Sequence, residues 1–142
     1  MFFGEFEYKL DEKGRVLIPP EFRGALRGGL ILMSGLEKCI AAYPIPEWEK
    51  IAASLTTGSL TQSKLRKLNR ALFATAFSRQ IDGQGRIALP PSLREYAGIT
   101  EEVVVAGVNT FLEIWDKNQW TSEKALSQEQ AWQIIETLER RR

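Results

Sequence analysis

The chain has 142 residues, of which 44% are apolar and 26% charged, and its formal net charge is +1. Histidine is absent and Cys39 is the single cysteine, so cysteine/histidine zinc sites, intramolecular disulfides and Ser-His-Asp or Cys-His catalysis are excluded. No apolar run is long enough to span a bilayer, and the first residues do not resemble a signal peptide. We therefore expect a cytoplasmic protein without a membrane partner.

A net charge this close to zero argues against a protein that binds polyanions strongly and non-specifically. The charge is nevertheless uneven, since residues 1–71 contain 11 basic and 8 acidic residues, whereas residues 72–142 contain 8 and 10. Basic side chains gather at Lys64, Arg66, Lys67 and Arg70, and again at residues 140–142.

The first half of the chain predicts four strands and two helices. Apolar and polar residues alternate over 5–10, which predicts a strand, and residues 15–18 predict the strand that returns from a turn at 11–14. Pro19 and Pro20 end that strand and favour the start of a helix. The other elements expected here are helices at 20–26 and 46–55 and strands at 30–34 and 38–43.

The second half repeats the first. The segment LDEKGRVLIPPEFR at 10–23 returns as IDGQGRIALPPSLR at 81–94. Both copies have the aspartate, the glycine three residues after it, two arginines and two consecutive prolines at corresponding positions. The same order of elements is therefore expected, with strands at 75–81, 86–89, 102–107 and 111–115 and helices at 91–97 and 117–126.

Two further helices are expected outside the duplication. Residues 61–74 place three leucines on one helical face, and residues 127–142 open with a capping-box pattern from Ser127 to Gln130. The apolar residues of the last segment follow at helical spacing, and it ends in three arginines that suit the negative end of the helix dipole.

Neither half has enough apolar surface for a robust core of its own. We therefore expect one compact α+β domain, in which two internal repeats fuse into a barrel-like β structure with pseudo-twofold symmetry and flanking helices. The parts expected are repeat one at about 1–60, a linking helix at about 61–74, repeat two at about 75–126 and a C-terminal helix at about 127–142.

The repeated Asp-x-x-x-Arg turn is the candidate functional feature. Asp11 and Asp82 are expected to orient each turn by accepting backbone N–H groups, and Gly14 and Gly85 to tolerate its positive φ. The arginine that follows each turn has two interpretations. It closes a purely structural ion pair across the turn, or it is displayed to an anion, since a guanidinium fits phosphate and the O6/N7 edge of guanine.

On the second interpretation the DNA-binding residues are those that leave the two turns. They are Lys13 and Arg15 in the first copy and Gln84 and Arg86 in the second. Lys64, Lys67 and Arg70 are candidates for additional phosphate contacts, although a basic cluster of this kind is most often a solvated helix face.

No chemistry for catalysis, a metal or a cofactor is indicated. Residues 83–88 match a G-x-G-x-x-A nucleotide-binding pattern, but two prolines follow where that motif needs a helix. We expect no enzyme activity, no bound metal, no cofactor and no small-molecule substrate.

The chain resembles the MraZ family of bacterial transcriptional regulators. The residues that carry the resemblance are Phe3-Gly4, the segment at 10–19 and its second copy at 82–90. The resemblance implies a double-split, swapped-hairpin barrel of the AbrB/MazE type, ring-shaped homo-oligomers and association with the nucleoid. It also implies binding to short direct repeats in the promoter of the division and cell-wall gene cluster through the Asp-x-x-x-Arg loops. The alternative is an antitoxin-like protein-interaction module without DNA specificity.

Overall fold

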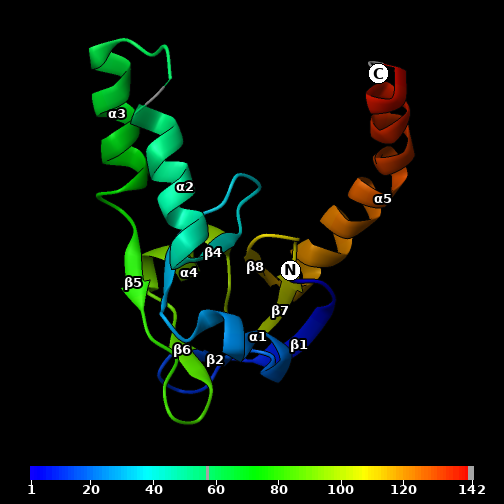
Figure 1. The fold of residues 1–142 in the computed structure, drawn as a ribbon. Coiled ribbons are helices and arrows are strands. Elements are labelled where there is room, and N and C mark those ends of the chain that lie inside the picture. The colour runs from blue at the N-terminus through cyan, green and yellow to red at the C-terminus, as the bar shows by residue number, and fades with distance from the viewer. Residues whose placement is uncertain (57, 141–142) are drawn as a thin grey trace.

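The computed structural model describes residues 1–56 and 58–140 of an α+β protein whose paired strands are all antiparallel. A six-stranded sheet has the order β1-β7-β8-β4-β3-β5, and β2 and β6 form a separate two-stranded sheet (Figure 1). The strands are β1 Glu5–Lys9, β2 Arg15–Leu17, β3 Leu30–Ser34, β4 Ile40–Pro44, β5 Phe77–Arg79, β6 Arg86–Ala88, β7 Glu102–Gly107 and β8 Leu112–Asp116. The helices are α1 Pro20–Arg23, extended by the 3-10 turn Gly24–Leu26, α2 Ile45–Thr56, α3 Gln62–Leu72, α4 Pro91–Ala97 and α5 Lys117–Arg140.

All the strands lie where the sequence predicts them, but two of the expected pairings are wrong. The strands on either side of each Asp-x-x-x-Arg turn do not pair with each other as a hairpin. Instead β1 pairs with β7 and β5 with β3, so the first strand of each repeat pairs with a strand of the other repeat within the six-stranded sheet. Strand pairing is a long-range choice that the alternation of apolar residues within one strand does not encode.

The core combines side chains of both repeats. Val16 and Ile87 pair across the two-stranded sheet and are fully or almost fully buried, and Ile18 and Leu89 follow them into the same cluster. At its edge, Phe22 meets Phe2 and Phe6 edge-on. Both halves supply this cluster. The duplication and the exchange of strands therefore bury apolar surface that neither half could cover alone.

The C-terminal region is one helix rather than two. The sequence predicts a helix at 117–126 followed by a second that starts with a cap at Ser127, whereas α5 runs without a break from Lys117 to Arg140. The Ser127 hydroxyl bonds to the Glu123 carboxylate one turn earlier. No glycine or proline interrupts residues 117–140, so continuing the helix keeps backbone hydrogen bonds that a new start would lose. Two of the three terminal arginines, at 141 and 142, lie outside the described residues.

Three helices, α2, α3 and α5, project from the side of the molecule opposite to the turn between β5 and β6 (Figure 1). In Figure 1, α2 and α3 rise from one end of the sheet and α5 rises from the other end, while the turn between β5 and β6 lies at the far side from both. No described helix is both long and apolar enough to cross a membrane.

Candidate nucleic-acid interface

The two Asp-x-x-x-Arg segments fold into the same tight loop. Asp11 Oδ1 accepts the backbone N–H groups of Lys13 and Arg15, both at 2.9 Å, and the Asp11 N–H donates to the Arg15 carbonyl at 3.0 Å. Gly14 closes the loop on the Asp11 carbonyl and has a φ of +73°. We call residues 11–15 the first loop and residues 82–86 the second loop.

The second loop repeats this geometry. Asp82 Oδ1 accepts the N–H groups of Gln84 and Arg86, both at 2.9 Å, and Gly85 has a φ of +79°. An aspartate that accepts N–H groups at the start of a turn and a glycine at its positive φ are the local determinants of this shape. The predicted orienting residues therefore adopt the predicted conformation in both copies.

Each loop aspartate also holds its arginine. Arg15 Nε donates to Asp11 Oδ2 at 2.6 Å, and Arg86 Nε donates to Asp82 Oδ2 at 3.0 Å. The hydrogen bond from the Arg15 backbone N–H, followed by that from its side chain, lowers the pKa of the Asp11 carboxyl, and the corresponding Arg86 groups lower the pKa of Asp82. Both aspartates are thus ionised at neutral pH, and each fixes the direction of one guanidinium.

The two loops meet through β2 and β6. Arg15 pairs with Ala88 and Arg86 with Leu17 in the antiparallel register, so both arginines lie on the face of this small sheet opposite to buried Val16 and Ile87. The side chains of Arg15 and Arg86 are 28% and 25% exposed. Arg86 Nη1 also lies 3.6 Å from Asp11 Oδ2, which joins one loop to the other.

Two arginines outside the predicted site lie against the loops. Arg94 of the second repeat lies on Gly14 of the first loop, where an added Cβ would come within 2.8 Å of the guanidinium carbon. Arg23 of the first repeat lies on Gly85 of the second loop, where a Cβ would collide with its guanidinium. The signal was present in the sequence, because Arg23 and Arg94 end the two repeated segments, but their contact partners lie in the opposite repeat.

The backbone holds these two arginines in place. Arg23 Nε donates to the Ile18 carbonyl at 2.8 Å and Arg94 Nε to the Leu89 carbonyl at 3.1 Å. A groove of about 450 Å³ beside the second loop is lined by Arg23, Arg27, Asp82 and Gly83, among others. Each loop therefore has a second guanidinium beside it, supplied by the other half of the chain.

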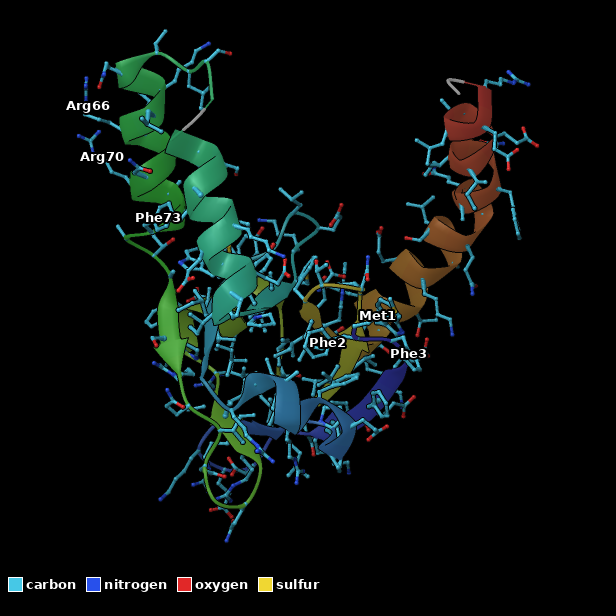
Figure 2. All side chains as sticks on the ribbon, viewed as in Figure 1. Met1, Phe2, Phe3, Arg66, Arg70 and Phe73 are labelled. Atoms are coloured by element: carbon cyan, nitrogen blue, oxygen red, sulfur yellow. The ribbon has the colours of Figure 1, made fainter. Side chains whose placement is uncertain are left out.

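The other predicted contacts are divided between two places. Lys13 and Gln84 are exposed within the loops, as the anion-binding interpretation requires. Lys64, Lys67 and Arg70 are exposed on α3, which lies on the opposite side of the molecule from the second loop (Figure 2). The structure therefore does not bring the α3 residues together with the loops.

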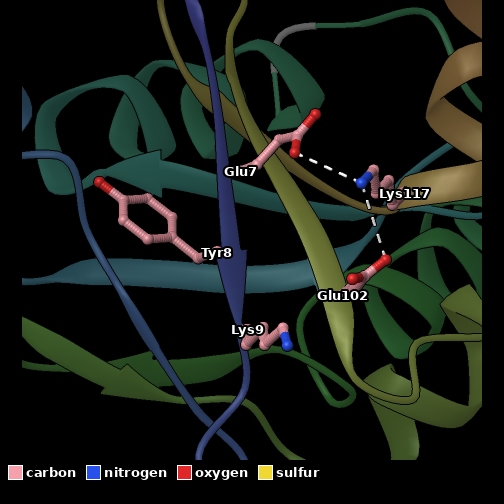
Figure 3. Close-up of a pocket in the computed structure, with 5 residues that line it drawn as sticks. All are labelled: Glu7, Tyr8, Lys9, Glu102 and Lys117. Atoms are coloured by element: carbon pink, nitrogen blue, oxygen red, sulfur yellow. Dashed lines mark ion pairs between the residues drawn. The ribbon is translucent and has the colours of Figure 1, made fainter.

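A second hollow is lined by Glu7, Tyr8, Lys9, Glu102 and Lys117, and Lys117 forms ion pairs with both of these glutamates. Lys117 Nζ lies 3.4 Å from Glu7 Oε2 and 3.7 Å from Glu102 Oε2, and so links β1, β7 and the start of α5 (Figure 3). Exposed ion pairs of this kind contribute at most about 1 kcal/mol. Among the described residues, no group of three or more histidine, cysteine or acidic side chains is placed to hold a metal ion.

The protein is therefore an internally duplicated α+β protein in which each of two fused repeats has one arginine-bearing loop. Comparison with known sequences gives the family. The family model described as "MraZ protein, putative antitoxin-like" matches the chain twice, over residues 1–71 and 72–141. The chain belongs to the MraZ family.

Three relatives that match most of this chain have the same name. A protein of Dehalococcoides mccartyi (strain BAV1) named "Transcriptional regulator MraZ" is 64% identical over 140 residues, which are 98% of this chain and 99% of the relative. Proteins of the same name from Herpetosiphon aurantiacus and Acetivibrio thermocellus are 46% and 43% identical, covering 84% and 86% of this chain and 84% and 85% of their own lengths.

Proposed function

We propose that the chain is a transcriptional regulator that binds DNA sequence-specifically through its two Asp-x-x-x-Arg loops. The observation that carries the proposal is that Arg15 and Arg86 share one face of the β2–β6 sheet, each held at Nε by an aspartate of its own loop. The names of the relatives support a role in transcription.

The loop geometry suits recognition of base edges. Because a carboxylate binds Nε, each guanidinium is held in one orientation and its terminal nitrogens are left to bind a ligand, although Arg86 Nη1 also lies 3.6 Å from Asp11 Oδ2. A guanidinium fixed in this way donates two parallel hydrogen bonds to guanine O6 and N7, and a two-stranded ribbon fits the major groove. Lys13 adds a phosphate contact to the first loop, whereas Gln84 adds an uncharged donor and acceptor to the second, so the two loops contact DNA unequally.

Arg23 and Arg94 belong to the same interface in this proposal. Their Nε atoms are bound to backbone carbonyls, and their half-buried side chains lie beside the loops. Phosphate contacts set the register of a protein on DNA and base contacts give specificity. We assign the phosphate contacts to Arg23 and Arg94 and the base contacts to Arg15 and Arg86. We assign no contact with the same segment of DNA to Lys64, Lys67 and Arg70, because α3 lies on the opposite side of the molecule from the second loop (Figure 2).

The exchange of strands between the repeats supports a barrel of the double-split, swapped-hairpin type, as in AbrB and MazE proteins. A single subunit of net charge +1 has few phosphate contacts and binds DNA weakly. A ring-shaped homo-oligomer that presents the same loops to successive direct repeats makes each later contact intramolecular, which adds a factor of about 10²–10⁴ in affinity. The operator we infer lies in the promoter of the division and cell-wall gene cluster, so the protein acts at the nucleoid in the cytoplasm, without a cofactor or enzymatic activity.

A gel-shift titration tests this proposal. The probe is the DNA upstream of the gene for this chain, with the number and the spacing of its short repeats varied. We expect affinity to rise steeply with repeat number and to fall steeply with salt, and Arg15→Ala or Arg86→Ala to weaken binding while circular dichroism stays unchanged. Wild-type affinity in both single variants and in the double variant would refute the loops as the site. Recovery of a stoichiometric protein partner in a pull-down without enrichment of promoter DNA would favour the antitoxin-like alternative.

A further inference from the structure

The distal half of α5 has an apolar stripe that the rest of the chain does not cover. We call residues 126–140 the C-terminal arm. Trp132, Ile135 and Leu138 follow one another at three-residue intervals, which places them on one side of the helix, and Trp132 is 72% exposed. None of the residues of α5 is buried, and in Figure 2 the arm stands clear of the sheet. An apolar stripe that is left uncovered along a long helix is typical of a protein-binding surface.

The other projection is equally incomplete. We call α2 and α3 the helical hairpin. Contact between Trp48 and Phe73, with ring centroids 5.2 Å apart, fixes its base. Beyond that contact, none of the side chains described in α2 or α3 is buried, and the leucines of α3 are only half-buried. A pair of helices that buries none of its described side chains leaves apolar surface that a further helix can cover.

The charges of the two projections are opposite. The α3 helix carries four basic residues and no acidic one, and the four are Lys64, Arg66, Lys67 and Arg70. The arm carries three acidic residues against one described basic residue, Arg140. Two of the acids, Glu129 and Glu136, lie three residues before and four residues after Trp132, so they flank the apolar stripe on the same side of the helix.

We propose that the C-terminal arm of one copy docks against the helical hairpin of a second copy of this chain. The arm and the hairpin rise from opposite ends of one sheet, so a chain does not satisfy its own surfaces (Figure 1). In the ring proposed above this contact is head-to-tail: each copy gives its arm to one neighbour and receives an arm from another. The basic residues of α3 then serve assembly. This inference deepens the self-association proposed above and is independent of DNA binding.

Size-exclusion chromatography with light scattering, on the full chain without DNA at micromolar concentration, tests the inference. The arm variant Trp132→Ala/Leu138→Ala is expected to fall from the wild-type assembly to a 16.1 kDa monomer with an unchanged circular dichroism spectrum. The hairpin variant Lys64→Glu/Lys67→Glu/Arg70→Glu is also expected to be a monomer, because its new carboxylates would repel the acidic side chains of the arm. Leu36→Ala is the matched control, since Leu36 is 95% exposed but lies outside both surfaces, and it keeps the wild-type mass.

Mixing the two monomeric variants makes the test decisive. The arm variant retains an intact hairpin and the hairpin variant retains an intact arm, so the mixture is expected to form a one-to-one dimer and nothing larger. A mixture that stays monomeric, or an arm variant with the wild-type mass, would overturn this inference while leaving DNA binding and ring formation standing. A monomeric wild-type chain would overturn the inference together with the ring, and would indicate a different protein as the partner of the arm.

Discussion

Arg23 of the first repeat lies directly against Gly85 in the loop of the second repeat, and Arg94 lies against Gly14 in the reciprocal contact. Each loop therefore takes its shape from its own sequence and its neighbouring cation from the other half of the chain. A change in either glycine should disturb both the backbone of the loop and the arginine beside it.

We expect Gly85→Ala to weaken DNA binding and to destabilise the fold. The φ of +79° strains any residue with a Cβ, and the new methyl group must displace the Arg23 guanidinium. The strain costs about 1–3 kcal/mol, which chemical denaturation measures, and the displaced arginine should lower operator affinity in a gel shift.

Gly83→Ala is the matched control for this prediction. Gly83 lies in the same loop, but its φ is not in the positive range and an added Cβ would have no atom within 4 Å. Its stability and its affinity should stay at the wild-type level. Equal losses in the two variants would mean that the contact with Arg23 is irrelevant to the loop.

The buried layer beneath the arginines should carry stability rather than recognition. Ile87 is 1% exposed and pairs with Val16 of the other repeat. Ile87→Ala should lower the free energy of unfolding by about 2–5 kcal/mol, and Ile87→Val by about 0.5–1.5 kcal/mol. Urea denaturation measures both. At a temperature where the Ile87→Val variant is fully folded, its operator affinity should match the wild type, and a large loss would show that the layer also sets the arginine geometry.

The local parts of this architecture were predictable because neighbouring residues determine them. An aspartate at the start of a turn and a glycine at its end specify each loop, and apolar periodicity specifies the strands. Repetition of one segment in both halves then identified the loops as the candidate site. The placement of Asp11, Arg15, Asp82 and Arg86 follows from this short-range chemistry.

Contacts between distant residues were not predictable in the same way. The pairing of β1 with β7 and the position of Arg23 on Gly85 depend on which half covers which core, and no single strand encodes that choice. The break predicted at Ser127 failed for a different reason. A capping-box sequence is compatible with the interior of a helix when the preceding residues are already helical.

Cys39 should be an inert thiol in the folded protein. Desolvation by burial, and next the nearby Glu113 carboxylate, raise the pKa of the Cys39 thiol well above its ordinary range. The thiolate that reacts with alkylating reagents is therefore scarce, and reaction with iodoacetamide at pH 8 should be slow in buffer and complete in denaturant. Rapid labelling of the native protein would show that the β3–β4 turn opens readily.

The loops should keep their shape in mild acid. The pKa values of Asp11 and Asp82 lie below the ordinary 3.8, because each carboxylate accepts first a backbone N–H and also a side-chain N–H of its arginine. For a carboxyl with a lowered folded pKa, the stabilisation is fully present above 3.8 and is lost as the pH falls through the folded value. NMR titration of the two carboxyl groups measures these values. In Arg15→Ala the pKa of Asp11 should rise only in part, since the backbone N–H of residue 15 remains, and a complete return to 3.8 would contradict this order of causes.

Substituting lysine for the two loop arginines separates recognition from charge. Arg15→Lys and Arg86→Lys retain the positive charge but lose the planar fork and the Nε hydrogen bond to the aspartate. Each should lose about 1–3 kcal/mol of discrimination between operator and unrelated DNA, while non-specific binding and its salt dependence stay nearly constant. Lys13→Ala is the contrasting variant, because loss of a phosphate contact should weaken binding to all sequences and reduce the salt slope by about 1. If the lysine variants instead keep full operator preference, Arg15 and Arg86 act as point charges on phosphate, and the bases are read by other residues of the loops.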